Sequence, residues 1–206
     1  MPYYRTPDSV SGLLRKYTFH LSRHERVLYL TFDDGPHPVI TPQVLELLEH
    51  FNAKASFFCV GDNLRKYPDV AEQVLEKGHL IGNHTFHHLN GWKTGNKSYF
   101  KDFLRAENQH ATQWFRPPYG KIKPIQAKAI FRTHQIAMWD VLSGDYRKSD
   151  SPEICTRRVI QHSKPGSIIV FHDSEKAEKN MLPALKKTLE YFSDKGYQFK
   201  ALPPQV

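Results

Sequence analysis

Short apolar runs alternate with longer amphipathic segments from about residue 26 to the end of the chain. Runs rich in β-branched and aromatic side chains predict strands, because these side chains pack well on a pleated, buried surface. The predicted strands span 27–32, 55–60, 79–82, 114–116, 136–140, 167–172 and 197–201. Strands that alternate with helices indicate βαβ units and therefore a parallel sheet.

Capping and helix-breaking residues predict where the helices between these strands begin and end. Thr41-Pro42 predicts a helix with threonine as its N-cap, since proline in the first turn gives up no hydrogen bond. Pro68 opens another helix, which Gly78 ends because glycine readily adopts the left-handed cap. Further helices are predicted to begin at Ser98, Lys123-Pro124 and Ser151-Pro152, and the last to span 182–194.

Seven predicted strands favour an α/β fold, a distorted (β/α) barrel with about seven parallel strands. The 206 residues are few for a closed eight-fold barrel, which typically has about 250. Residues 1–25 are basic, contain proline and lack clear periodicity, so we expect an N-terminal arm packed across the bottom of the barrel. A single domain then spans 26–206, and 39% hydrophobic residues suffice for its core.

Polar residues gather at the carboxyl ends of the predicted strands. That end is the face on which α/β barrels carry their chemistry, so we expect the active site there. The residues concerned are Asp33, Asp34, His84, Arg116, Tyr119, Asp140, Asp145 and His172.

The string Thr-Phe-Asp-Asp-Gly-Pro at 31–36 predicts a carboxylate pair facing one cavity. Gly35-Pro36 ends the apolar strand, because glycine takes unusual dihedral angles and proline cannot donate to a ladder. Neighbouring side chains diverge within a strand, but at its broken end Asp33 and Asp34 can both reach the same space.

The string His-Thr-Phe-His-His at 84–88 predicts metal ligands. His84 and His88 are four residues apart, so one turn of helix or a tight loop presents both imidazoles on one side. His87 is the competing ligand at spacing three. Two histidines with Asp34 leave coordination positions open, as catalytic metal sites do and closed structural sites do not.

Charge and apolar content limit the partners. The net charge of +8 and pI of about 9.4 are compatible with a polyanion, but Lys and Arg are scattered and no nucleic-acid motif accompanies them. We therefore expect a solvated basic face and no nucleic-acid partner. No run approaches a membrane span and the start lacks a signal-peptide pattern, so we expect a cytoplasmic location. A peripheral membrane contact through the basic arm is left open.

Cys59 and Cys155 are the only cysteines in the sequence. Both lie in apolar or helical patterns and nothing else indicates an oxidising compartment. We expect two buried, reduced thiols rather than a disulfide.

Taken together, the ordered strings resemble the polysaccharide deacetylase (NodB-homology) family of carbohydrate esterases over about residues 26–202. The string at 31–36 is identical to that family's first motif, the string at 84–88 matches its second, and Arg-Pro-Pro-Tyr at 116–119 resembles its third. Segments 54–58 and 78–83 resemble the strands between these motifs. A lone His-x-x-x-His would be weak evidence, whereas five ordered matches are specific.

The resemblance implies a role for each site residue and a polysaccharide-deacetylase-like barrel. Asp34, His84 and His88 would hold a divalent metal, most favourably zinc, although cobalt, nickel, manganese or iron also suits such a set. Asp33 resembles the general base and Arg116 the arginine that orients it. His172 resembles the general acid, Asp145 the aspartate that raises its pKa, and Tyr119 the residue whose backbone N–H stabilises the oxyanion.

Several positions depart from the family pattern or have two interpretations. Leu142 stands where many members have aspartate, Tyr146 where many have the tryptophan of the acetyl-methyl groove, and Ile169 and Phe171 where leucines are usual, which puts substrate choice in question. Trp92 either stacks on a sugar ring of the substrate or packs against the protein itself. Asp173 and Ser174 either orient the site or cap the next helix.

The sequence therefore predicts a metal-dependent hydrolase that removes acetyl groups from N-acetylated amino sugars in an oligo- or polysaccharide, such as chitooligosaccharide, peptidoglycan or a related glycan. The alternatives are an O-acetyl xylan esterase, a ring C–N amidohydrolase and an inactive glycan-binding module. A glycosidase is less favoured, since its carboxyls stand about 5 Å or more apart across a sugar ring. No P-loop, dinucleotide fingerprint or nucleophile elbow is present.

Overall fold

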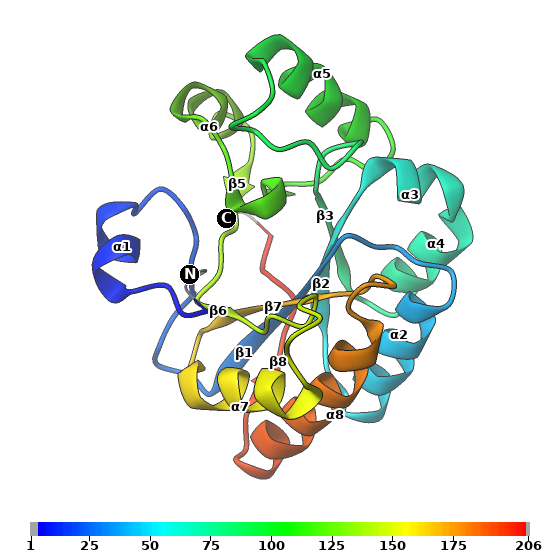
Figure 1. The fold of residues 1–206 in the computed structure, drawn as a ribbon, viewed down its shortest axis with the longest axis vertical. Coiled ribbons are helices and arrows are strands. Elements are labelled where there is room, and N and C mark those ends of the chain that lie inside the picture. Colours follow the sequence, from blue (N-terminus) through cyan, green and yellow to red (C-terminus); the bar gives the residue numbers. More distant parts are fainter. Residues whose placement is uncertain (1–3, 205–206) are drawn as a thin grey trace.

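Parallel strands form one sheet through the centre of the computed structural model, which describes residues 4–204, and helices lie around its outside (Figure 1). The strand order is β5-β4-β3-β2-β1-β7-β6, with β8 added beside the start of β1. The strands are β1 Val27–Asp33, β2 Ala55–Cys59, β3 Leu80–Asn83, β4 Trp114–Phe115, β5 Gln135–Ile136, β6 Val141–Leu142, β7 Ile168–His172 and β8 Gln198–Phe199. Since the end strands β5 and β6 do not pair, the barrel is incomplete, and the predicted α/β fold with a distorted barrel is confirmed.

Helices cover the sheet, and the main core lies between them and the strands β1, β2 and β7. The helices are α1 Asp8–Leu13, α2 Ile40–His50, α3 Gly61–Lys66, α4 Pro68–Glu76, α5 Asn96–Glu107, α6 Pro124–Ile130, α7 Pro152–His162 and α8 Glu178–Asp194, with a 3₁₀ turn η1 at Pro118–Gly120. The predicted starts at Pro68 and Pro124 are confirmed. Ser151 caps α7 as expected, accepting a hydrogen bond from Ile154 N.

Three predicted helix starts are wrong. The helix expected from Ser98 begins two residues earlier, at Asn96. Thr41 is not an N-cap but lies inside α2, where its hydroxyl accepts a hydrogen bond from His37 N and donates one to Asp173. The last helix begins at Glu178 rather than at 182, so Pro183 lies within it. All three helices begin earlier than predicted, because tertiary contacts override local sequence signals at helix ends.

The predicted strand at 136–140 is wrong as a single element. The chain leaves β5 after Ile136 and crosses to the opposite end of the sheet before β6. On the way, Met138 N donates to Thr18 O of the arm and Asp140 N donates to Ile168 O. The backbone groups are thus paired with separate partners, so this apolar segment does not form one ladder.

The N-terminal arm runs along the open side of the barrel. At the β5 edge, Thr18 N donates to Ile136 O, and at the β6 edge Leu142 N donates to Tyr4 O. Only towards its end does the arm lie at the amino end of β7, where Leu21 N donates to Gly166 O. The expected position across the bottom therefore describes just this last part, and the domain boundary at residue 25 stays a prediction.

The register of the central strands places the functional side chains together. Asp33 ends β1 opposite Phe58 of β2 and His172 of β7. All strand pairs in the sheet are parallel, so their carboxyl ends meet at one edge. Cys59 and Cys155 are both free and buried, as expected.

Candidate active site

Asp33 is a buried carboxylate fixed by a buried arginine. Its Oδ1 accepts a hydrogen bond from Arg116 Nη1 at 2.6 Å, and neither side chain is more than 7% exposed. The same guanidinium group donates to Thr31 Oγ1 and to the backbone oxygens of Ala137 and Met138. Charge-assisted bonds of this kind define the orientation of the carboxylate.

Asp34, His84 and His88 form a compact three-residue cluster beside this pair. One ligand atom from each lies within 4.8 Å of the other two. His88 Nε2 is 3.1 Å and His84 Nε2 3.8 Å from Asp34 Oδ1. The predicted residues are thus brought together, on the loop after β1 and the loop after β3.

The protonation states of His84 and Asp34 fit a divalent metal. Burial lowers the pKa of His84 to about 4, so its imidazole is neutral. His84 Nδ1 is hydrogen-bonded to Arg116 O at 2.8 Å, which leaves the Nε2 lone pair for a ligand. Burial alone would raise the pKa of Asp34, but the hydrogen bond from His88 and the nearby imidazoles hold it far below its usual range. Neutral imidazole and ionised carboxylate are the forms that bind metals.

Asp102 of α5 holds the 84–88 loop in place. Its carboxylate accepts hydrogen bonds from Phe86 N and His87 N, each at 2.9 Å, and lies 2.5 Å from His87 Nδ1. His87 is thereby turned towards α5, and only His88 of the two competing histidines joins the cluster. The side-chain oxygen of Asn83 accepts a further hydrogen bond, from Thr85 N at 2.8 Å.

Four residues around the site have left-handed backbone conformations that only glycine adopts without cost. Such conformations cost about 1–3 kcal/mol each and persist where surrounding contacts enforce them. Hydrogen bonds around these positions supply such contacts: Asn63 Nδ2 donates to Asp34 O, Leu89 N donates to Thr85 Oγ1, and Gly120 N donates to Pro117 O across Tyr119. The residues and φ values are Asp34 at 80°, Thr85 at 60°, His88 at 56° and Tyr119 at 61°.

His172 and Asp145 form an ion pair at the carboxyl end of β7. His172 Nδ1 donates to Asp145 Oδ1 at 2.8 Å, and Asp145 Oδ2 accepts from His172 N at 2.8 Å. Burial alone would lower the pKa of His172, but the charge and hydrogen bond of Asp145, with Asp34 and Asp33 nearby, raise it to about 9. The ring is therefore an imidazolium at neutral pH, with Nε2–H left for a substrate.

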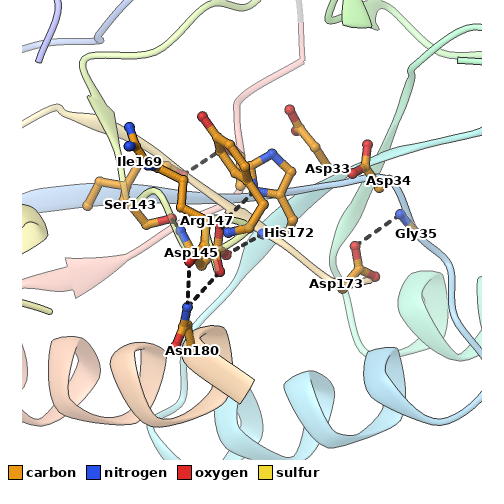
Figure 2. Close-up of polar contacts among 12 residues, drawn as sticks. Asp33, Asp34, Gly35, Ser143, Asp145, Arg147, Ile169, His172, Asp173 and Asn180 are labelled. Carbon is orange, nitrogen blue, oxygen red and sulfur yellow. Dashed lines mark hydrogen bonds and ion pairs between the residues drawn. The ribbon is translucent and has the colours of Figure 1, made fainter. Parts of the chain in front are cut away.

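Asn180 of α8 supports the loop that carries Asp145. Its side-chain amide donates to the backbone oxygens of Asp145, Arg147 and Asp150 at 3.0, 3.2 and 3.1 Å. Figure 2 shows it reaching from the helix towards Asp145, below His172. Neither Asn180 nor Asp102 was predicted from the sequence, where the only signal is a polar residue on a helix face that should be apolar.

Asp173 orients the turn after β1. Its carboxylate is fully buried and accepts a hydrogen bond from Gly35 N (Figure 2). It also accepts one from the Thr41 hydroxyl. A Cβ at Gly35 would lie 2.1 Å from Asp173 Oδ2, so only glycine fits there. Of the two interpretations of Asp173, orientation of the site is the one that these contacts favour.

A cavity of about 300 Å³ connects these groups. Asp33, Asp34, His84, His88 and His172 lie in its wall, and its apolar lining comes from Trp139, Leu142, Tyr146 and Val170. Leu142 and Tyr146, the positions that depart from the family pattern, thus both face the cavity. The Tyr146 ring packs edge-on against His172 at 5.0 Å between centroids.

One exposed aromatic ring lines the cavity, and a second lies beside Lys121 of its wall. The Tyr119 side chain is 60% exposed and its ring centroid lies 4.6 Å from that of His88. Trp92 is 61% exposed, with its Nε1–H donated to Ile122 O. Trp92 is therefore not a core residue, unlike Trp114 and Phe115, which are buried as expected.

The chain is similar in sequence to known deacetylases. The chain matches the family model described as "Polysaccharide deacetylase" over residues 20–136. A peptidoglycan-N-acetylglucosamine deacetylase of Bacillus cereus is 34% identical over 195 residues, covering 91% of this chain and 70% of that protein. A chitooligosaccharide deacetylase of Azorhizobium caulinodans is 33% identical over 166 residues, covering 74% and 76%.

A solved structure has the same fold over almost the whole chain. It is that of the Bc1960 peptidoglycan N-acetylglucosamine deacetylase in complex with 4-naphthalen-1-yl-N-oxidanyl-benzamide. It matches with a TM-score of 0.88 and 32% identity, covering 96% of this chain and 95% of that one.

Proposed function

The chain belongs to the polysaccharide deacetylase family, and from that premise we propose that it is a divalent-metal-dependent hydrolase that removes acetyl groups from N-acetylated amino sugars. The substrate would be an oligo- or polysaccharide, in line with the peptidoglycan and chitooligosaccharide deacetylases to which the chain is similar. One observation carries the proposal: a three-ligand cluster, an oriented carboxylate and a protonated histidine line the same cavity.

Asp34, His84 and His88 would hold the metal, for which we propose zinc. When bound, a divalent cation polarises the acetyl carbonyl and lowers the pKa of water towards about 7. Asp33 accepts the proton of the attacking water, because Arg116 holds its Oδ1 and leaves Oδ2 for that proton. The backbone N–H of Tyr119 would stabilise the oxyanion on the substrate carbon.

His172 then completes the reaction as the general acid. As the C–N bond breaks, His172 Nε2–H protonates the leaving nitrogen, while Asp145 holds the ring through Nδ1. The products are a free amine and acetate. An amine leaving group needs this proton far more than an alcohol does, so an imidazolium at this position favours amide over ester substrates. The O-acetyl esterase is therefore the second candidate.

The remaining alternatives have less support. Glycan binding without catalysis would not require the buried Asp33–Arg116 pair at the cavity or the imidazolium beside it, which argues against an inactive glycan-binding module. A ring amidohydrolase would use the same groups on a small substrate, so only a substrate panel separates it from a glycan deacetylase.

Acetate release from N-acetylated chitooligosaccharides and peptidoglycan fragments tests the proposal. Exhaustive chelation should abolish release, and zinc should restore it. The Asp33→Asn variant should bind zinc with normal stoichiometry yet release acetate about 10²–10⁴ times more slowly. Full activity in metal-free protein, or no acetate from any glycan with metal bound, would contradict the proposal.

A further inference from the structure

Two lysines line the cavity together with the functional residues. Lys121 follows the turn η1 after β4, and Lys176 follows β7 four residues beyond His172. They come from separate loops at the carboxyl edge of the sheet. Neither is required by the chemistry of water attack or of amine protonation.

Each ammonium group lies near an aromatic ring instead of a carboxylate. Lys176 Nζ is 5.3 Å from the ring centroid of Tyr146, the ring that packs on His172. Lys121 Nζ is 5.4 Å from the ring centroid of Trp92. Within residues 4–204 neither lysine forms an ion pair, whereas Lys66 at the end of α3 and Lys77 just after α4 each pair with a carboxylate at 2.6 Å.

The carboxylates of the cavity are already engaged. Arg116 neutralises Asp33, His172 pairs with Asp145, and Asp34 belongs to the three-ligand cluster. The two ammonium charges, on the half-buried Lys121 and the exposed Lys176, are therefore uncompensated at the cavity, whose low-dielectric walls focus their field on an anion. The aromatic rings restrict the lysine stems, which lowers the entropy lost when an anion binds.

We propose that Lys121 and Lys176 select acetylated glycans that carry a carboxylate on the reacting sugar or its neighbour, in preference to neutral glycans. The inference rests on the proposed function and deepens it by naming the substrate class. Each lysine acts on substrate binding, so its loss should raise KM for acidic substrates and leave kcat unchanged.

The test uses three tetrasaccharides and the zinc-loaded protein. One alternates N-acetylglucosamine with N-acetylmuramic acid and bears free carboxylates, the second is its methylamide derivative, and the third is tetra-N-acetylchitotetraose. We expect kcat/KM at least about fivefold higher for the acid than for its methylamide, falling with added salt because the ion pairs are screened.

Variants assign the preference to the two side chains. Lys176→Met and Lys121→Met should each reduce the acid-to-methylamide ratio about two- to fivefold, the range of a partly exposed ion pair. Lys176→Arg should retain the ratio. Lys179→Met, at an exposed lysine of α8 that does not line the cavity, is the matched control and should leave it unchanged.

The outcomes separate the two proposals. Equal rates on the acid and its methylamide would overturn the lysine selectivity while the deacetylase function stands. A loss in the Met variants that is the same for all three substrates would show that the lysines are structural, and would also overturn it. Failure of all three substrates to release acetate would instead contradict the proposed function.

Discussion

At the scale of single residues, partners rather than residue types decide the chemistry of the site. His84 and His172 are both almost buried histidines, yet the pKa of His84 falls to about 4 and that of His172 rises to about 9. Burial lowers both, but His172 alone has a carboxylate hydrogen-bonded to its Nδ1, whereas His84 has a carbonyl. One imidazole is thus ready to ligate and the other to donate a proton.

The His172–Asp145 pair gives a pH prediction. The pKa of His172 is raised above its unfolded value, so its contribution to stability is complete below about pH 6.5 and is lost as the pH rises through about 9. The imidazolium is also the proposed general acid, so the upper limb of the pH–rate profile should lie at or below about pH 9. It can lie below about pH 9 because a cation bound beside Asp34 offsets part of the increase in the pKa of His172.

Asp145→Asn should move that upper limb to lower pH. Without the carboxylate charge, burial pulls the pKa of His172 to about 6.5 or less, and the protonated fraction at pH 8 then falls roughly 30-fold. Acetate release measured from pH 5 to 10 should show this loss, with zinc content unchanged. A profile identical to that of the parent protein would remove the role assigned to Asp145.

At the scale of elements, helices outside the sheet determine how the loops at its edge are shaped. The loop 84–88 has no regular structure and contains two left-handed residues, and α5 supplies the carboxylate that satisfies its N–H groups. In the same way α8 supplies Asn180 to the loop that carries Asp145. Each helix thus positions a loop of the site that belongs to another part of the chain.

Asp102→Ala should weaken metal binding although Asp102 is not in the ligand cluster. Removing the carboxylate leaves two backbone N–H groups unpaired and frees His87, so the loop no longer holds His84 and His88 together. Loss of such a supporting partner typically costs about 10–100-fold in metal affinity. Competition with a chromophoric chelator measures it, and Glu72→Ala on the exposed face of α4 is the control. Equal zinc affinities in the two variants would show that the loop holds its shape without Asp102.

At the scale of the whole molecule, the N-terminal arm covers the side on which the barrel is open. It is joined to both end strands and is anchored by Arg23, whose guanidinium group bonds to Asp140 Oδ2 at 2.9 Å, to Pro165 O and to Ser167 Oγ. Asp140 is almost completely buried, so it depends on this partner for charge compensation.

In the part of the chain that the structure describes, no helix is long and apolar enough to cross a membrane.

Arg23→Ala should therefore destabilise the fold by about 2–3 kcal/mol. This is less than the roughly 3–5 kcal/mol for a fully enclosed pair, because the Arg23 side chain is 29% exposed. The free energy of unfolding from denaturant titration measures the change. Arg132→Ala, at an exposed position, should stay within about 0.5 kcal/mol of the parent protein. Comparable values for both variants would mean that the arm adds little to the fold.

The sequence by itself determined the features that depend on residues close together in the chain. Strand β1 and the turn after it follow from an apolar run ended by Gly35-Pro36, and the starts of α4, α6 and α7 follow from proline and capping signals. The members of the three-residue cluster, Asp34, His84 and His88, come from two short strings. In each case the signal lies within a few residues, where backbone geometry and side-chain spacing act directly.

Only the tertiary structure decided the rest, because it depends on contacts between residues far apart in the chain. The apolar pattern at 136–140 predicts one strand, but its backbone groups form hydrogen bonds to the arm and to β7, so the segment is not a single strand. Asp102, Asn180 and Lys176 look like ordinary helix and loop residues until packing brings them to the site. Local patterns carry no information about which distant hydrogen bonds or charges will meet, and those meetings set the pKa values, the loop shapes and the charge of the cavity.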